Sequence, residues 1–455
     1  MAHISFVLNG EVIELGKANP SVTLLDYLRL ERGLVGTKEG CNEGDCGACT
    51  VSVASMENGS LVHRAVNSCI LLLGQMQGKS VTTVEDLGGN HPVQTAMVDH
   101  HGSQCGFCTP GIVMSLAAAH QEGRQDHRDV LAGNLCRCTG YAPILRAAEA
   151  VAEQPVPAAK FDERAALESL VDSGFTDVDA FAEWYAKNPD AVLVGGATEV
   201  GLVLTKELKQ PKKFAFLNRI EALQEIIHED GGIRIGSGVL LARLRGAMAG
   251  KYPQFAEMLR RFGSVQVRNS ATIGGNIANG SPIADSPPAL IALGASITLR
   301  KGAERREILL EDFYLSYGVQ DRAEGEFVES VFIPEQEDTL GVYKISKRFD
   351  QDISALCGAF NIVVNDGSVA SARIAFGGMA ATPKRAKAVE SALVGVPWNE
   401  ETIAAAQSAF AEDYTPLSDQ RGSAAYRLTL AQNLLMRYYL EHSGQDRVRV
   451  VGAVS

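Results

Sequence analysis

The grouping of the cysteines constrains this chain more than any other feature of its sequence. Eight of the nine cysteines lie between residues 41 and 138, in two quartets of unlike spacing. The quartets are Cys41, Cys46, Cys49 and Cys69, followed by Cys105, Cys108, Cys136 and Cys138. No secretory leader is recognisable at the start of the 455 residues, so we expect a reducing compartment, where clustered cysteines are typical of metal sites.

The first quartet reads C-x4-C-x2-C with a distant fourth cysteine, which is the spacing of a plant-type 2Fe-2S site. Its loop contains Gly40, Gly44 and Gly47, and glycine allows the backbone to turn its N–H groups toward cluster sulfurs. The alternatives are a structural zinc site and buried thiols without a metal. The unequal x4 and x2 spacings favour the cluster over paired zinc ligands.

The second quartet is placed by predicted helix ends. Thr109 is expected to be an N-cap and Pro110 the first helical residue, so Cys108 would lie near the positive end of a helix, which favours a thiolate. Another helical pattern follows Cys136 and Cys138. Two helix N-termini beside four thiols indicate a second metal cluster in a small helical domain.

Three strings around these cysteines resemble the iron–sulfur region of the molybdenum hydroxylases, the family that includes the xanthine dehydrogenases. They are EGCNEGDCGACT at residues 39–50, QCGFCTPG at residues 104–111 and CRCTGY at residues 136–141. The resemblance implies a ferredoxin-like domain followed by a helical domain, with one 2Fe-2S cluster in each. It covers about the first 150 residues.

The hydrophobic periodicity predicts a multidomain α+β chain. A strand at residues 3–8, a turn at Asn9-Gly10 and a strand at residues 12–15 are expected first, then a helix over residues 23–31 and a strand at residues 50–54. From Val81 the pattern is helical up to a proline-containing linker. Strands at residues 353–364 and 369–376 and a helix at residues 424–442 are expected near the end.

These patterns and the family resemblance give five segments. We predict a ferredoxin-like β-grasp 2Fe-2S domain at residues 1–80, a helical 2Fe-2S domain at 81–153, a linker at 154–165, an α+β FAD-binding domain at 166–340 and a C-terminal mixed-sheet α/β domain of the flavoprotein at 341–455.

Two glycine-rich segments lie within the predicted FAD-binding domain. Residues 191–201 read as a buried strand, a glycine turn and a helix, and residues 272–285 concentrate Gly, Asn, Ser and Thr, which offer backbone N–H groups to a pyrophosphate. Alone, the first is equally consistent with an ordinary turn and the second with an elaborate loop.

In this order, behind two cysteine quartets, the two segments are similar to the flavin domain of the same family. The resemblance implies FAD contacts from Leu193, Val194, Gly195, Gly196, Ala197, Thr198, Glu199, Val200, Phe262, Thr272, Ile273, Gly274, Gly275, Asn276, Asp285, Val328 and Lys344. Asp285 is expected on the ribose or adenine side, and Lys344 at the flavin. For Lys344 and Arg348 the alternative is a solvated basic strand end.

The resemblance also implies an NAD+-dependent oxidoreductase in which this chain transfers electrons. The large molybdopterin domain is absent from the sequence, so we expect the molybdenum cofactor and the catalytic residues on a large partner subunit, in an α2β2 assembly. Electrons would pass through both clusters to FAD and NAD+ during oxidation of hypoxanthine or xanthine to urate. The alternatives are the same role in another molybdenum hydroxylase, a stand-alone iron–sulfur flavoprotein carrier, and a zinc-stabilised scaffold.

Composition narrows the setting of the protein. The net charge of −12 argues against standing contact with nucleic acid or anionic lipid, which require clustered Lys and Arg. No apolar run reaches the roughly 18–20 residues that a membrane-spanning helix needs. We therefore expect a cytoplasmic protein.

Overall fold

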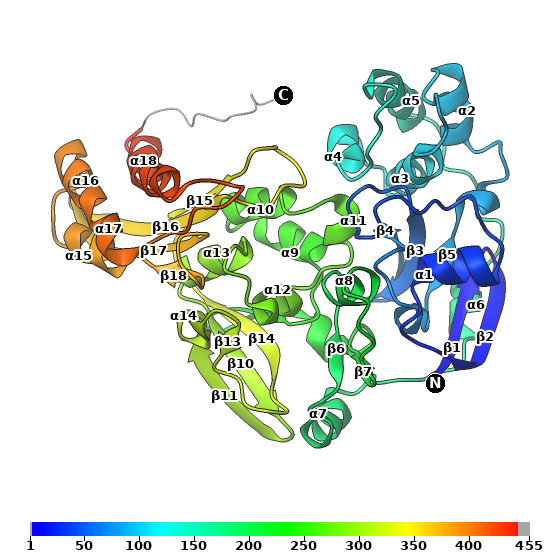
Figure 1. Ribbon diagram of the computed structural model, residues 1–455, viewed down its shortest axis with the longest axis horizontal. Coiled ribbons are helices and arrows are strands. Elements are labelled where there is room, and N and C mark those ends of the chain that lie inside the picture. Colours follow the sequence, from blue (N-terminus) through cyan, green and yellow to red (C-terminus); the bar gives the residue numbers. More distant parts are fainter. Residues whose placement is uncertain (1, 445–455) are drawn as a thin grey trace.

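The computed structural model describes residues 2–444, and the predicted C-terminal domain therefore includes residues 445–455 that lie outside the described part. Along the molecule lie an N-terminal sheet and a group of helices at one end, a central sheet with its helices, and a C-terminal sheet at the other end (Figure 1). The predicted multidomain α+β architecture is confirmed. None of the described helices is long and apolar enough to cross a membrane.

The N-terminal sheet has the strand order β2-β1-β5-β3-β4, with β1 and β5 parallel and the other neighbours antiparallel. Its strands are β1 (Ala2–Leu8), β2 (Glu11–Ala18), β3 (Thr50–Glu57), β4 (Ser60–Asn67) and β5 (Ser80–Thr82). The predicted hairpin is confirmed, with positive φ angles at Asn9 and Gly10. The predicted boundary between residues 80 and 81 falls inside β5, so the sheet includes Val81 and Thr82 where helix was expected.

The helix expected over residues 23–31 is interrupted. Thr23 caps the short helix α1 (Leu24–Asp26), and the chain then widens into a π-helical turn, η1 (Tyr27–Glu31), closed by the Arg32 N–H on the Tyr27 carbonyl. The wider turn allows Tyr27 and Leu28 to be buried against the sheet. Hydrophobic periodicity does not distinguish this turn from an ordinary helix.

The second region is a group of four helices around a core of its own. They are α2 (Pro92–Asp99), α3 (Thr109–Gln121), α4 (His127–Leu131) and α5 (Ala142–Ala152). Helix α3 begins one residue earlier than predicted: Cys108 is its N-cap and Thr109 is already helical, with its hydroxyl 2.7 Å from that of Ser103. The predicted proximity of Cys108 to a helix N-terminus is confirmed.

The central region is built on a five-stranded sheet of order β11-β10-β14-β9-β8 and a parallel pair, β6 and β7. Its strands are β6 (Val192–Val194), β7 (Phe214–Phe216), β8 (Ile226–Glu229), β9 (Gly232–Gly236), β10 (Ser296–Lys301), β11 (Glu304–Leu309), β12 (Tyr314–Ser316), β13 (Val319–Gln320) and β14 (Phe327–Pro334). Its helices are α6 (Glu163–Glu168), α7 (Val178–Lys187), α8 (Val200–Thr205), α9 (Leu241–Met248), α10 (Pro253–Arg260), α11 (Val265–Arg268), α12 (Ile273–Asn279), α13 (Ser286–Ala292) and α14 (Leu310–Phe313).

Half of residues 272–285, which could have been an elaborate loop, form a helix. Thr272 caps α12, with its hydroxyl accepting from the Gly275 N–H at 3.1 Å, and Gly280 ends the helix in a left-handed conformation. Asp285 is the N-cap of α13. Glycine and asparagine are poor helix formers, so their abundance hides a helix that its cap and buried Ile273 and Ile277 support.

The C-terminal region consists of the antiparallel sheet β15-β16-β17-β18 covered by helices. Its elements are β15 (Leu340–Ile345), β16 (Leu356–Asn365), β17 (Ser368–Gly377), β18 (Lys384–Arg385), α15 (Lys387–Leu393), α16 (Glu400–Ala406), α17 (Phe410–Asp413) and α18 (Ala424–His442). The strands and the long helix predicted here are confirmed, and α18 has the predicted bounds.

The predicted linker returns along the N-terminal sheet. Lys160 forms an ion pair with Asp86 at 3.3 Å, and Glu163 in α6 pairs with His63 on β4 at 3.1 Å. These contacts place residues 160–168 against the first region, so the central region starts close to the N-terminal sheet in space.

Candidate functional site

The loop of the first quartet wraps around its own sulfurs. The N–H groups of Asp45 and Cys46 each donate to the Cys41 Sγ at 3.3 Å, and the Cys41 N–H donates to the Cys46 Sγ at 3.3 Å. The predicted turns are present, since Gly44 and Gly47 have positive φ angles. A side chain on Gly47 would collide with the Gly133 carbonyl at 2.1 Å. The local sequence thus folds N–H donors inward toward thiols, as an iron–sulfur site requires.

The four thiols of this quartet lie together. Cys41 contacts both Cys46 and Cys69 through its side chain, and Cys49 contacts Cys69. The hydrogen bonds with Cys46 and then Cys69 hold the pKa of Cys41 well below its usual range, which favours the thiolate that binds metals. Cys49 and Cys69 are buried.

The second quartet forms two pairs at the surface of the helical region. Cys105 contacts Cys138, and Cys108 contacts Cys136. Cys105 and Cys138 are exposed, whereas Cys108 and Cys136 are half-buried. Burial raises the pKa of Cys108 to about 12, against the direction expected from the helix end, so a metal bound here must displace that proton.

Both donor sets fit a two-iron cluster. Within residues 2–444, no three His, Cys, Asp or Glu side chains converge on one point closely enough to hold a single metal ion. A 2Fe-2S cluster has four cysteine ligands shared between two irons, so each iron needs only a pair of thiolates. The second quartet supplies two contacting pairs, and the first supplies a chain of contacts, Cys46–Cys41–Cys69–Cys49, that contains two pairs.

The two cysteine loops touch each other. The Leu135 N–H, one residue before Cys136, donates to the Cys46 carbonyl at 2.9 Å. The Asn134 side chain donates to the Gly47 carbonyl at 3.0 Å, and Asn134 is buried. The peptide groups beside one quartet are therefore hydrogen-bonded to those beside the other.

A cavity of about 720 Å³ lies on the other side of the first loop. Glu43, Gly44, Asp45 and Ile70 of the N-terminal region line one end of it. The turn after β6, the start of α12 and the β15 end of the C-terminal region line the rest. Its volume is within the range of small-molecule and cofactor sites, about 300–1,000 Å³.

Glycines allow the segments of the cavity wall to pack closely against their neighbours. A Cβ on Gly196 would lie 1.9 Å from the Ser270 carbonyl oxygen, and one on Gly274 would lie 2.4 Å from the Ser237 Cβ. Ala197, which directly follows Gly196, has a φ of 58°, a left-handed conformation that residues other than glycine rarely adopt. This turn exposes successive backbone N–H groups beside the N-terminus of α12, an arrangement suited to a pyrophosphate.

A buried ion pair forms another part of the wall. The Lys344 Nζ donates to the Asp285 carboxylate at 2.6 Å and to the Ser354 Oγ at 2.8 Å, and Ser354 donates to Asp285 at 2.6 Å. Lys344 and Asp285 are 5% and 6% exposed. Lys344 is therefore not a solvated strand end. The Arg348 side chain, 67% exposed, is one.

The structure brings together nearly all the residues expected at the flavin. Among them only Val194 and Ile273 lie outside the cavity lining, and both are fully buried in the cores beside it. Four further residues that line the cavity, Ser237, Gly238, Arg322 and Phe327, belong to no recognisable sequence motif. These residues come from ordinary strand ends and loops, so only the fold identifies them.

Family models match most of the chain. Residues 6–72 match a 2Fe-2S iron–sulfur cluster binding domain, and residues 83–149 match a second [2Fe-2S] binding domain. Residues 175–336 match the FAD binding domain in molybdopterin dehydrogenase, and residues 341–442 match the CO dehydrogenase flavoprotein C-terminal domain.

Known proteins similar to the chain fall into two groups. The xanthine dehydrogenase of Dictyostelium discoideum is 30% identical over 97% of this chain and 40% of its own length. The xanthine dehydrogenase of Drosophila subobscura is 32% identical over 97% of this chain and 39% of its own length. The chain thus spans about two fifths of these curated relatives. Among solved structures, a carbon monoxide dehydrogenase from Hydrogenophaga pseudoflava (27% identity, TM-score 0.55) aligns over 58% of this chain and 93% of its own. Quinoline 2-oxidoreductase from Pseudomonas putida 86 (26% identity, TM-score 0.55) aligns over 59% of this chain and 94% of its own.

Fold, cysteine loops and cavity together define an iron–sulfur flavoprotein of the oxidoreductase class, with two 2Fe-2S domains and an FAD-binding domain. The family models and the relatives agree on the lineage. The chain is similar over most of its length to the iron–sulfur and FAD-binding part of the molybdenum hydroxylases.

Proposed function

We propose that this chain is the iron–sulfur and FAD subunit of an NAD+-dependent xanthine dehydrogenase. The observation that carries the proposal is the order of the three sites. The first cysteine loop lines the flavin cavity through Glu43, Gly44 and Asp45, and it is hydrogen-bonded on its other side to the second loop. The second loop exposes Cys105 and Cys138 at the molecular surface.

Each quartet would hold one 2Fe-2S cluster, the first on Cys41, Cys46, Cys49 and Cys69 and the second on Cys105, Cys108, Cys136 and Cys138. The turn at residues 193–200 and the start of α12 would hold the FAD pyrophosphate, with Phe262, Val328, Asp285 and Lys344 along the rest of the flavin. When bound, the clusters carry single electrons and the flavin collects them in pairs for a nicotinamide. The protein fixes the sequence of sites and shields the buried ones.

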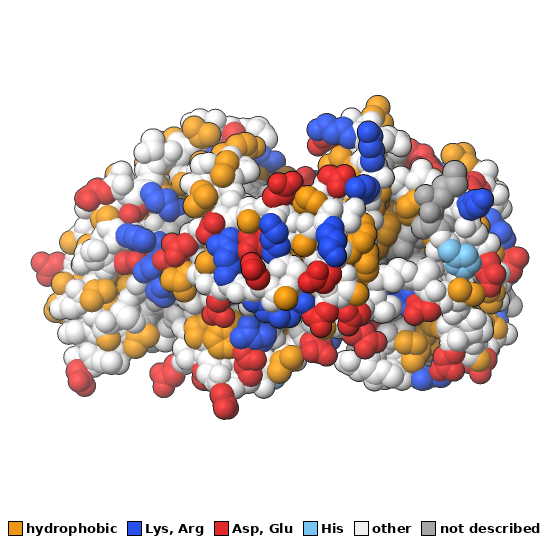
Figure 2. All heavy atoms as spheres, turned by 90° about the horizontal axis from the view of Figure 1, so that it is seen from below, with side chains coloured by type: hydrophobic (Ala, Val, Ile, Leu, Met, Phe, Trp, Pro, Cys, Tyr) orange, Lys and Arg blue, Asp and Glu red, His pale blue; other side chains and the backbone are white. Residues whose placement is uncertain are grey.

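The exposed second quartet is where a partner would dock. Cys105, Cys138 and the neighbouring Phe107 and Leu135 are exposed, with Phe107 at 48% and Leu135 at 54%. We propose that a large molybdopterin-binding subunit covers this surface in a cytoplasmic α2β2 assembly, and that NAD+ reacts at the flavin end. Acidic and basic side chains are intermingled on the face shown in Figure 2, which offers no basic stripe for a nucleic acid.

The domain boundaries proposed from the sequence serve this function. The two cluster domains would occupy residues 1–82 and 83–153, with the boundary expected at residue 80 moved past the end of β5, followed by the linker 154–165, the FAD-binding domain 166–340 and the C-terminal domain 341–455. Contacts across these boundaries hold the sites together, such as Lys206 on α8, whose ammonium lies 3.4 Å from the Glu43 carboxylate of the first loop.

A second candidate is the same electron-transfer role toward another substrate. The solved structures similar to this chain bear the names of carbon monoxide dehydrogenase and quinoline 2-oxidoreductase. The substrate pocket would lie on the partner in either case.

Purification from the native source with its co-purifying large chain tests the proposal. We expect iron, acid-labile sulfide, FAD and molybdenum in the complex, and reduction of NAD+ with xanthine or hypoxanthine. Activity with a different heterocycle or an aldehyde only would favour the second candidate. Zinc in place of iron, or a chain that purifies alone with its full electron-transfer activity, would contradict both.

A further inference from the structure

A second cavity lies behind the flavin pocket, between the N-terminal sheet and the central region. Its volume is about 1,100 Å³. The ends of β3 and β4, the turn before β5, the segment after α6 and the loop before β8 line it. Gly195, Leu217, Gly238 and Thr272 line both cavities, so one layer of residues separates them. None of the eight cysteines of the two quartets lines this junction cavity, and of the residues expected at the flavin only Gly195 and Thr272 do.

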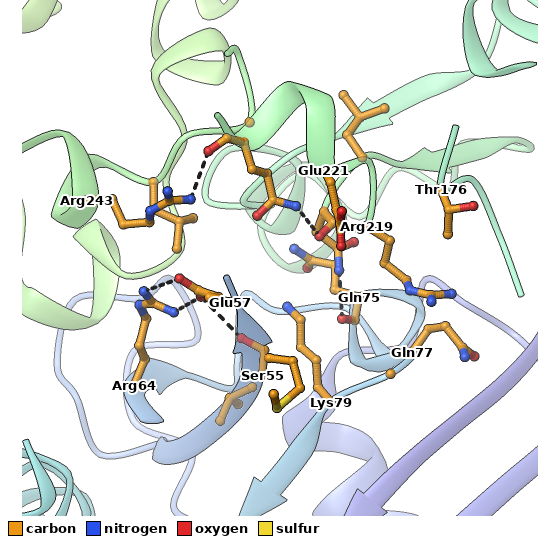
Figure 3. Close-up of a pocket in the computed structure, with 18 of the residues that line it drawn as sticks. Ser55, Glu57, Arg64, Gln75, Gln77, Lys79, Thr176, Arg219, Glu221 and Arg243 are labelled. Atoms are coloured by element: carbon orange, nitrogen blue, oxygen red, sulfur yellow. Dashed lines mark hydrogen bonds and ion pairs between the residues drawn. The ribbon is translucent and has the colours of Figure 1, made fainter. Parts of the chain in front are cut away.

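Lys79 stands in the middle of the junction cavity. Its side chain extends inward between the Glu57–Arg64 pair on one side and Gln75 and Arg219 on the other (Figure 3). No carboxylate or other acceptor binds its ammonium group among the described residues. Burial in the junction, and then the charge of Arg64, lowers the pKa of Lys79 to about 8. The nearby Glu57 carboxylate raises this pKa by less than burial lowers it, so a further anion would stabilise the partly buried ammonium group.

Two of the other three cationic side chains that line the cavity are paired with carboxylates. Arg64 is neutralised by two hydrogen bonds to Glu57, and Arg219 pairs with Asp172. Arg243 forms no ion pair in the described structure and donates only to the Gln224 carbonyl, at 2.9 Å.

The lining carboxylates that form no ion pair in the described structure are exposed. Glu168, Glu221 and Glu225 are all exposed, where water screens them. Lys79 and Arg243 are therefore the two cationic side chains of the lining that form no ion pair in the described structure.

The walls add an apolar surface. Val53, Leu71, Leu167 and Leu240 are buried or nearly so at the cavity, and Met56 and Ile226 are half-buried. A bare inorganic anion would leave most of the volume and this surface unused. A molecule with an organic body and a doubly charged anionic group uses both.

We propose that the junction cavity binds a small organic phosphate, whose dianionic group pairs with Lys79 and is balanced by Arg243. Lysine is a common phosphate ligand, and hydrogen bonds between charged groups are stronger than those between neutral groups. The site is separate from the flavin pocket, so it can be occupied while FAD is bound.

Calorimetric titration of the FAD-loaded protein with AMP, and with adenosine as its uncharged counterpart, tests the site. We expect AMP to bind about tenfold or more tightly than adenosine, since the phosphate alone distinguishes them. Lys79→Met should weaken AMP binding by a similar factor and leave adenosine unchanged. Lys187→Met, at a side chain 76% exposed, is the matched control and should change neither.

The pH dependence is a second measurement. Anion binding favours the charged amine, so the affinity for AMP should be level from about pH 7 up to the Lys79 pKa of about 8 and fall as the pH rises above it. AMP stays a dianion over this range, because its second pKa is about 6. The charged groups that face Lys79 are Glu57, Arg64, Arg219, Arg243 and Glu221. A flat profile would contradict the role of Lys79.

Protection of wild-type Lys79 from acylation covers the case of a variant that fails to fold. Peptide mass spectrometry should show slower acylation of Lys79 with AMP present, and an unchanged rate at Lys187. Equal binding of adenosine and AMP, no detectable binding of AMP, or binding unaffected by Lys79→Met would each overturn the proposal. These outcomes are independent of the identity of the hydroxylase substrate.

Discussion

At the scale of single residues, the eight cysteines have separable roles. Cys136 contacts neither the flavin cavity nor the first quartet. We predict that Cys136→Ser removes the second cluster and lowers the iron content to about half, because one iron loses one of its two thiolates. Electron flow from a partner should stop, while NADH-to-dye reduction at the flavin end continues.

Electron paramagnetic resonance of the reduced protein measures this directly, since the two clusters give separate signals. The buried Cys357, on β16 and outside both quartets, supplies the control: Cys357→Ala should keep both signals. Equal loss of both activities in Cys136→Ser would contradict the proposed order of sites.

Lys344 gives the second prediction at this scale. Lys344→Met leaves the Asp285 carboxylate buried without its cation, which costs about 3–5 kcal/mol of folding free energy, and it should lower the FAD content. Exposed Lys347→Met is the control. The double variant Lys344→Met/Asp285→Leu should regain much of the stability, because replacing both partners of a buried pair by apolar residues is often neutral.

Thermal unfolding and flavin absorbance per chain separate the two effects. The double variant should unfold near the parent temperature but stay poor in flavin. Full flavin content in either variant would show that this ion pair supports only the fold.

At the scale of elements, the turn after β6 depends on close packing. Gly196→Ala forces a methyl group against the Ser270 carbonyl, at a cost of about 1–3 kcal/mol, and we predict a lower FAD content with iron unchanged. Gly246→Ala is the matched control, because nothing lies within 4 Å of its Cβ position in α9. It should be neutral or stabilise by up to about 1 kcal/mol. Iron lost in parallel with flavin would contradict separate sites.

The elements also show what the sequence can predict. The hairpin at Asn9-Gly10 and the helix at residues 424–442 follow local rules, a turn dipeptide and an amphipathic repeat, and both were predictable. Helix α12 was not, because its glycines suggest a loop and its evidence is a cap and two buried isoleucines. The N-cap at Cys108 was displaced by one residue, since Thr109 offers the same capping chemistry as a true cap.

At the scale of the whole molecule, Gln266 joins the central region to the helical region. This buried side chain on α11 donates to Ser115 on α3 and to the Asn134 side chain beside the second quartet, both at 3.0 Å. Gln266→Leu leaves these acceptors without a donor, at about 1–3 kcal/mol. We predict that the helical region then unfolds in a separate, earlier calorimetric transition. Exposed Gln125→Leu should keep the parent profile, and a single unshifted transition in Gln266→Leu would contradict the role of this junction.

The assembly of the sites could be predicted only in part. Each cysteine quartet is encoded by spacing within a short stretch, and the resemblance to a family supplied the flavin segments. The contact of the first loop with the flavin cavity depends on Ile70 and Gly201 meeting across the fold, where a Cβ on Gly201 would lie 2.7 Å from the Ile70 carbonyl. The junction cavity combines Lys79, Arg64 and Arg243, which no local pattern connects.

The unequal burial of the two quartets should make the two clusters differ in their stability in air. Cys49 and Cys69 are only 2% and 1% exposed, whereas Cys105 and Cys138 face the solvent. Oxygen and peroxide attack the sulfurs that they can reach. An isolated preparation left in air should therefore bleach in two stages, surface cluster first and inner cluster much later, and a bound large subunit should slow only the first.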